Sequence, residues 1–280
     1  MEEKKMRKQK KLLAVILSII MIFSLAACGN NSNDGETIFN VATSGGYDTM
    51  NFFTTESSLV YDWLNILYDS LIAYDDEYNA IPRAAKDWTV SDDGRTWTFN
   101  LRDDIYFSDG EQLTSADVKW TYEHAIDSYM YSTHADGFES IECPDEFTVV
   151  FNCSHPKPDM LYQIIPILPE HVWANVEDPL TYETTDIVGS GPFRYDSATA
   201  FVKNGEYWGD VPKLDVLVFT KYDNTDAIAQ ALKLGEVDAA YTLEITQKET
   251  LEAAGNIDVQ TFGTYDFEYV GYNLLDDICK

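Results

Sequence analysis

The chain has 280 residues, with 19 Lys and Arg against 48 Asp and Glu, and its net charge at pH 7 is −29. Because so acidic a surface repels phosphate groups, the composition argues against nucleic-acid binding. Aromatic residues make up 14% of the chain, which is enough for a substantial core and is atypical of a disordered acidic segment. We therefore expect a folded protein with one large or two modest domains.

Residues 1–27 predict a lipoprotein signal peptide. A basic start precedes the apolar run Leu12–Ala26, which is short for a membrane span but suits the core of a signal peptide. The run leads through small residues into Cys28 and resembles a bacterial lipobox, so we expect cleavage before Cys28 and lipidation of its thiol. A plain signal peptide with an incidental cysteine is the alternative. Residues 28–36 then form a flexible tether, and cleavage takes the net charge to −33.

The first folded residues predict a strand and a long helix. Thr37–Thr43 has the composition of a strand and leads into a loop of small residues, Ser44-Gly45-Gly46. Thr55–Ile72 then predicts a helix. The apolar stripe of that helix consists of Leu59, Trp63, Leu67 and Leu71.

Residues 84–126 have the clearest pattern. Trp88–Val90 and Thr96–Leu101 alternate apolar and polar residues around Asp92-Asp93-Gly94, which predicts a hairpin with Gly94 at positive φ. A further short strand ends at Asp109-Gly110, and Thr114 with Asp117 then predicts a capping box at the start of a helix. The predicted apolar face of this helix consists of Val118, Tyr122, Ala125 and Ile126.

The remaining residues predict shorter elements. Phe138–Ile141 and Phe147–Phe151 are expected to pair as strands. The turn between them would leave Cys143 and Cys153 too far apart for a disulfide, so free thiols are expected. The other predicted elements are a short helix at Asp159–Ile165, a buried strand at Val211–Phe219, and a helix capped by Thr225 that carries Ile228, Ala231 and Leu232 and ends at Gly235.

Several sequence segments, and their order along the chain, closely resemble those of the solute-binding proteins of peptide and nickel ABC importers. These are the bacterial extracellular solute-binding proteins of family 5. Residues 91–120, SDDGRTWTFNLRDDIYFSDGEQLTSADVKW, carry the resemblance best. The segments Leu67–Tyr74, Ile167–Trp173 and Asp186–Arg194 are also similar and follow in the family's order. One departure is mild: Asn51 stands where an Asp is usual, and the proline that follows in the family is missing.

The resemblance implies an α/β periplasmic-binding-protein-like fold of type II, with two lobes and an inserted subdomain. Residues 37–55 and 186–275 would form the first lobe, and residues 56–185 the inserted subdomain. The similarity ends near Asn273, before the second lobe of the family. We therefore expect a fragment whose solute binding is impaired, because one wall of the cleft between the lobes is missing.

For ligand contacts, the resemblance indicates Glu56, Ser57 and Ser58, which would line the cleft just before the first long helix. The alternative is that these residues only cap that helix. Tyr131, in a segment at the edge of the cleft, and Asn273, whose amide can both donate and accept hydrogen bonds, are further candidates. We expect no catalytic residues, no cofactor and no metal, because His124, His134, His155 and His171 lack zinc spacing and no nucleophile motif is present.

The predicted function is that of an extracytoplasmic receptor that captures oligopeptides or dipeptides for an ABC permease. Its only membrane attachment would be a lipid anchor on the outer face of the cytoplasmic membrane. Two alternatives stay open. One is a secreted, lipid-anchored enzyme such as a glycosidase, which needs two carboxylates facing a cleft. The other is a lipoprotein without a transport role that binds a partner through an exposed face.

Overall fold

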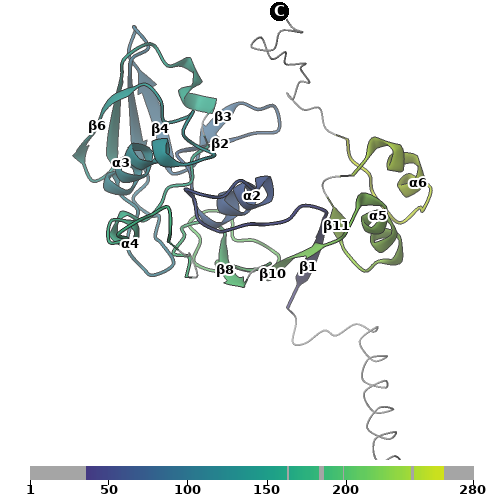
Figure 1. Ribbon diagram of the computed structural model, residues 1–280. Coiled ribbons are helices and arrows are strands. Elements are labelled where there is room, and N and C mark those ends of the chain that lie inside the picture. The colour runs from purple at the N-terminus through teal and green to yellow at the C-terminus, as the bar shows by residue number, and fades with distance from the viewer. Residues whose placement is uncertain (1–35, 163, 183–185, 198, 241–242, 262–280) are drawn as a thin grey trace, which may run out of the picture. The chain divides into compact units, whose positions relative to one another are not determined.

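The computed structural model describes residues 36–162, 164–182, 186–197, 199–240 and 243–261 (Figure 1). These residues divide into two compact units. The first unit contains residues 45–219 together with the chain up to residue 40, and the second contains residues 41–44 and the chain from residue 220. The division differs from the lobe boundaries expected from the family resemblance, which stay a prediction.

A four-stranded antiparallel sheet, with strand order β4-β5-β7-β6, lies in the first unit. Every second residue of β5 and β7 is buried. One of these residues is Phe151, whose ring lies 4.9 Å from that of Tyr122 on helix α3. Gly94 closes the β4–β5 hairpin at φ +70°, as predicted. The bounds are β4 Ala85–Val90, β5 Thr96–Leu101, α3 Ser115–His124, β6 Phe138–Asp145 and β7 Thr148–Cys153.

The start of α3 confirms the predicted capping box, since Thr114 and Asp117 satisfy each other's backbone amides. Its apolar face is confirmed at Val118, Tyr122 and Ala125, which are buried. The prediction for Ile126 was wrong, because this side chain is 49% exposed. The α-helix ends at His124, and the 3-10 turn η1 (Ala125–Asp127) that follows changes the direction of Ile126.

Helix α2 (Ser58–Leu67) is shorter than predicted at both ends. Leu59, Trp63 and Leu67 form its buried stripe as expected. The C-terminal part of the predicted helix is instead an extended segment that leads into strand β2 (Ile72–Tyr74), which pairs with β3 (Ala80–Pro82). Leu71 is buried, but it lies in this extended segment and is not part of the helix.

Three further predictions in the first unit need correction. The short helix expected at residues 159–165 is a 3-10 turn, η2 (Pro158–Tyr162). The expected strand near Tyr106 is a single bridge to Gln112. The buried strand expected at Val211–Phe219 is β10, which begins only at Val216, and Phe219 is its single buried residue. The remaining elements are α4 (Glu170–Trp173), β8 (Phe193–Ser197), β9 (Ala200–Lys203) and β10 (Val216–Lys221), in which β9 pairs antiparallel with both β8 and β10.

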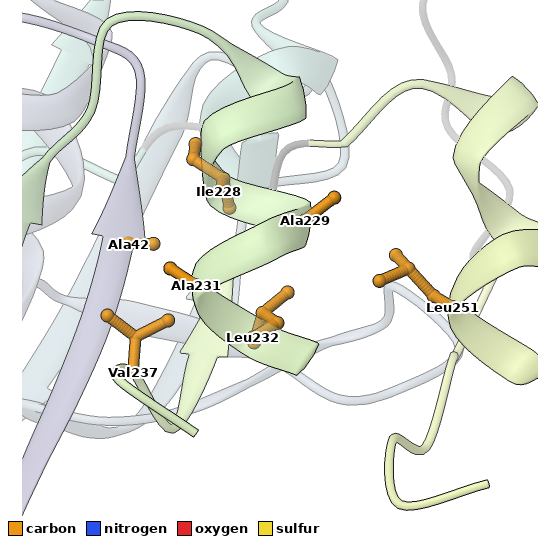
Figure 2. Packing of buried hydrophobic residues seen from close by; sticks show 7 residues of the cluster. All are labelled: Ala42, Ile228, Ala229, Ala231, Leu232, Val237 and Leu251. Atoms are coloured by element: carbon orange, nitrogen blue, oxygen red, sulfur yellow. The ribbon is translucent and has the colours of Figure 1, made fainter. Parts of the chain in front are cut away.

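In the second unit, part of β1 (Ile38–Thr43) pairs in parallel with β11 (Ala239–Ala240) and packs against α5 (Thr225–Leu234). Asn224, not Thr225, caps α5, because the Asn224 side chain accepts from the amide of Ala227. Gly235 ends the helix in the left-handed conformation, as predicted. The 3-10 turn η3 (Ile245–Gln247) and helix α6 (Lys248–Glu252) follow. Figure 2 shows the core, formed by Ala42, Ile228, Ala229, Ala231, Leu232, Val237 and Leu251.

Cys143 and Cys153 are free thiols, as predicted. Phe138 lies opposite Cys153 in the β6–β7 pair, so Cys143 lies farther along β6 toward the turn. Within the described ranges, no helix is both long and apolar enough to cross a membrane. Cys28 and Asn273 lie outside the described residues.

Candidate functional site

The segment that leads into α2, residues 45–58, is held together by the carboxylate of Asp48. Its two oxygens accept hydrogen bonds from the amide of Glu56 at 2.7 Å, the hydroxyl of Thr55 at 2.8 Å and the amide of Thr49 at 2.7 Å. Burial by itself would raise the pKa of Asp48, but these hydrogen bonds outweigh it and lower the pKa below its usual value. We call residues 45–58 the pre-α2 segment.

Two of the three predicted ligand residues in this segment have side chains that remain available. The carboxylate of Glu56 and the hydroxyl of Ser58 are exposed, and neither is hydrogen-bonded to another described residue. Ser57 differs, because its hydroxyl accepts from the Val60 amide at 3.4 Å as the N-cap and donates to the Gly46 carbonyl at 2.8 Å. The capping interpretation thus applies to Ser57, whereas Glu56 and Ser58 stay candidates for ligand contact.

Tyr131 lies in the core behind this segment. Its ring stacks between Phe52 and Tyr61, with centroids 4.5 Å and 5.5 Å apart, and none of its surface is exposed. Burial raises the pKa of its hydroxyl well above the ordinary value, and that hydroxyl is bonded to none of the described residues. A direct contact between Tyr131 and a ligand stays a prediction, and it requires neighbouring side chains to move.

Asn51 has a role that the sequence did not indicate. Its buried amide nitrogen donates to the carbonyls of Pro179 and Tyr182, at 2.7 Å and 2.9 Å, while its oxygen accepts from the Phe53 amide at 2.7 Å. The side chain therefore ties the pre-α2 segment to residues 179–182, of which Thr181 and Tyr182 line a depression of about 710 Å³ beside α4. A carboxylate could not make the two donations, which explains why Asn suits this position.

A second feature that sequence reasoning missed is an ionic cluster at the C-terminal end of α2. Asp69 is fully buried, and its carboxylate accepts from Arg83 Nε at 2.7 Å, Trp208 Nε1 at 2.9 Å and the Tyr207 hydroxyl at 3.2 Å. We call these four residues the buried junction. The sequence shows Asp69 only as one acidic residue in the segment Leu67–Tyr74. Two of its three partners, Tyr207 and Trp208, lie 138 and 139 residues away in the chain.

The electrostatics of the buried junction favour the charged form of Arg83 and the neutral form of Tyr207. Burial opposes the charge on Arg83, but Asp69 and Tyr207 outweigh it and raise the pKa of the guanidinium. Burial and the Asp69 charge together raise the pKa of Tyr207 to about 12, so the phenol stays protonated and donates. Each oxygen of Asp69 is satisfied within the protein, so this carboxylate is not available to a ligand.

The segment Gly189-Ser-Gly191 packs directly on the C-terminal end of α2. The Gly191 amide donates to the Leu67 carbonyl at 2.9 Å, and Ser190 Oγ accepts from the Asp69 amide at the same distance. A Cβ on Gly189 or Gly191 would lie 2.1 Å or 2.4 Å from a carbonyl oxygen of α2. Both glycines are therefore required by close backbone approach, which is a more specific role than the tight turn that the sequence indicated.

Two of the histidines have contacts with aromatic or acidic side chains. The His124 ring stacks on that of Trp120, with centroids 4.1 Å apart. His171 Nε2 is 2.7 Å from Asp109 Oδ2, which joins α4 to the loop before α3. Within the part of the chain that the structure describes, no three His, Cys, Asp or Glu side chains converge in a way that could hold a metal ion.

Comparisons with known proteins agree with the resemblance in the sequence. The model of the family "bacterial extracellular solute-binding proteins, family 5 Middle" matches residues 79–279. Protein XP55 of Streptomyces lividans is 33% identical over 215 residues, which cover 73% of this chain and 39% of that protein. The chain spans about half the length of the curated relatives it matches.

Two solved structures share the fold. NikZ from Campylobacter jejuni, in complex with Ni(L-His), is 22% identical with a TM-score of 0.66, and the match covers 78% of this chain and 45% of that one. DppA from Helicobacter pylori, in complex with the peptide STSA, is 24% identical with a TM-score of 0.64, and the match covers 78% and 49%. These matches support the predicted two-lobed periplasmic-binding-protein fold, of which this chain covers less than half.

Proposed function

Because the chain belongs to the bacterial extracellular solute-binding proteins of family 5, we propose that it acts as an extracytoplasmic solute receptor of an ABC importer. The family match over residues 79–279 is the observation that carries this proposal. The similar proteins are binding proteins of ABC transporters, which favours binding over the glycosidase alternative. Delivery of the solute to a permease is part of this proposal.

We propose oligopeptides or dipeptides as the solute. DppA, with a related fold, was solved with a four-residue peptide, whereas NikZ was solved with a nickel–histidine complex. The exposed carboxylate of Glu56 can bind an ammonium or a backbone amide, and the Ser58 hydroxyl can donate to a peptide carbonyl. These two side chains match the hydrogen-bonding groups of a peptide, which is why we propose this class of solute.

Binding by this chain alone is expected to be weak. Two-lobed receptors bury most of a solute between their lobes, and this chain covers less than half of the structures it matches. A lipid on Cys28 would keep the protein at the outer face of the cytoplasmic membrane. Labelling with a radioactive fatty acid tests the anchor, because a Cys28→Ala variant should lose the label.

A ligand screen on the purified full chain tests the solute class. Thermal shifts should rise with the concentration of short peptides, in the millimolar range, and should not rise with nickel–histidine complexes or sugars. A Glu56→Gln, Ser58→Ala double variant should weaken the peptide response, whereas Glu77→Gln, an equally exposed carboxylate at the β2–β3 turn, should not. A response to nickel complexes or sugars alone would contradict the peptide proposal.

A further inference from the structure

Strand β6 forms one edge of the four-stranded sheet (Figure 1). A groove lies beside the first half of this strand. The groove has a volume of about 340 Å³ and lies between the C-terminal end of α3 and residues 135–141. Its lining includes Tyr122 and Ile141, which are buried, and Ile126, which is 49% exposed. We call this feature the β6 edge groove.

The rim of the β6 edge groove is acidic. Glu123, Asp136 and Glu139 all line it. Glu123 pairs with Lys119, but Asp136 and Glu139 have no ion-pair partner among the described residues. An apolar lining under two unpaired carboxylates suits a long basic side chain, whose methylene groups can pack on rings and aliphatic groups while its charge stays at the rim.

The backbone next to the groove is an open sheet edge. Strand β7 pairs with one side of β6, and no other described strand pairs with the opposite side. The Ile141 carbonyl is held there by the Lys119 ammonium, at 2.7 Å, which is a side-chain contact and not a strand pairing. Pro144 and the charges of Glu139 and Glu142 discourage pairing with an acidic strand, including a second copy of β6.

From the groove, its charge and the open edge together, we propose that β6 is a docking site for an extended, basic segment of a partner protein. The segment adds to the sheet as a further strand, through hydrogen bonds to the outer backbone of β6. An Arg or Lys side chain of the segment enters the groove and meets Asp136 and Glu139. None of the residues that line the groove belongs to the pre-α2 segment, and the proposed contact does not require a bound solute.

Fluorescence anisotropy with the purified full chain tests the proposal. The probe is a short labelled peptide of alternating Thr and Val with a central Arg, blocked at both ends so that it lacks terminal charges. It should bind, and a peptide with Glu in place of Arg should not. Glu139→Gln and Asp136→Asn should each weaken binding roughly fivefold, as expected for one partly exposed charge pair.

Glu142→Gln is the matched control. It removes the same charge from the same strand, but Glu142 bonds Asn152 on the other face of the sheet, so binding should change less than about twofold. Strand addition is tested separately with two peptides N-methylated at alternate residues. One of the two should lose binding, because only one set of amides faces β6. An excess of the solute found in the screen should not displace the probe.

Four results would overturn the proposal. They are equal losses with Glu142→Gln and Glu139→Gln, full binding by both methylated peptides, binding of spermidine as tight as that of the probe, or self-association of the chain that Asp136→Asn abolishes. The third would assign the groove to small cations, and the fourth would assign the edge to a second copy of the chain.

Discussion

The buried junction and the pre-α2 segment each contain a carboxylate, Asp69 and Asp48, but the two differ in burial and in the partners that they bind. Asp69 is fully buried, and its partners come from two other parts of the chain, Arg83 at 14 residues and Tyr207 with Trp208 at 138 and 139 residues. Asp48 is exposed and bonds only to residues within eight positions of it. The first arrangement joins segments that are remote in sequence, whereas the second shapes one loop and leaves its neighbours Glu56 and Ser58 free for a ligand.

The largest effect should come from removing the charge of Asp69. An Asp69→Asn variant leaves Arg83 partly buried without a counter-charge, which should lower the free energy of unfolding by roughly 3–5 kcal/mol. Asp104→Asn is the control, because Asp104 also lies 2.7 Å from an arginine but at an exposed site, and should cost less than about 1 kcal/mol. Urea unfolding measures both, and equal losses would contradict the inference that burial makes the Asp69–Arg83 pair more important for stability than an exposed pair.

The next effect tests the close packing at the end of α2. A Gly191→Ala variant places a Cβ against backbone atoms of Ile66 and Leu67, and it should cost roughly 1–3 kcal/mol. Gly205→Ala adds the same atom where nothing lies within 4 Å, so its unfolding free energy should hardly change. If both variants unfold at the same urea concentration, the contact does not constrain the fold.

A smaller effect separates capping from ligand contact within the pre-α2 segment. Ser57→Ala removes the N-cap of α2 and should cost about 1 kcal/mol in unfolding free energy. Ser58→Ala removes an exposed hydroxyl and should leave stability within about 0.5 kcal/mol of the parent. A larger loss in the Ser58 variant would show that the cap is assigned to the wrong serine.

The smallest expected effect depends on pH. Since folding lowers the pKa of Asp48, its contribution is present above the unfolded pKa of about 3.9 and is lost as the pH falls through the lower folded value. Asp48→Asn should therefore be less stable than the parent at neutral pH, by under about 1 kcal/mol for so exposed a group. That difference should shrink in acid. A difference that is constant with pH would contradict the assigned hydrogen bonds.

Local patterns predicted much of the first unit. The hairpin at Gly94, the capping box of Thr114 and Asp117, and the pairing of β6 with β7 all depend on residues close in sequence, and all were confirmed. Some errors concern the type of element, as at the 3-10 turn η2 and the single bridge of Tyr106, and others lie at the ends of elements. Helix α2 begins at Ser58 because Thr55 is bonded to Asp48, and the cap of α5 falls one residue earlier than predicted.

The candidate site was only partly predictable. The family resemblance indicated residues 56–58, but sequence alone could not divide them into a capping Ser57 and the free side chains of Glu56 and Ser58. Asn51 and Asp69 were missed because their partners lie more than 100 residues away in most cases. Such contacts have no local pattern, so only the folded chain reveals them.

Hydrogen exchange with and without peptide tests the account most directly. A peptide from the screen, added at saturating concentration to the full chain, should slow exchange of backbone amides in residues 45–58. Amides of β4 to β7 should be unaffected, because the proposed solute site does not include that sheet. Protection confined to other described segments, or no protection at a concentration that shifts the melting temperature, would contradict the assignment of the pre-α2 segment as the solute-binding surface.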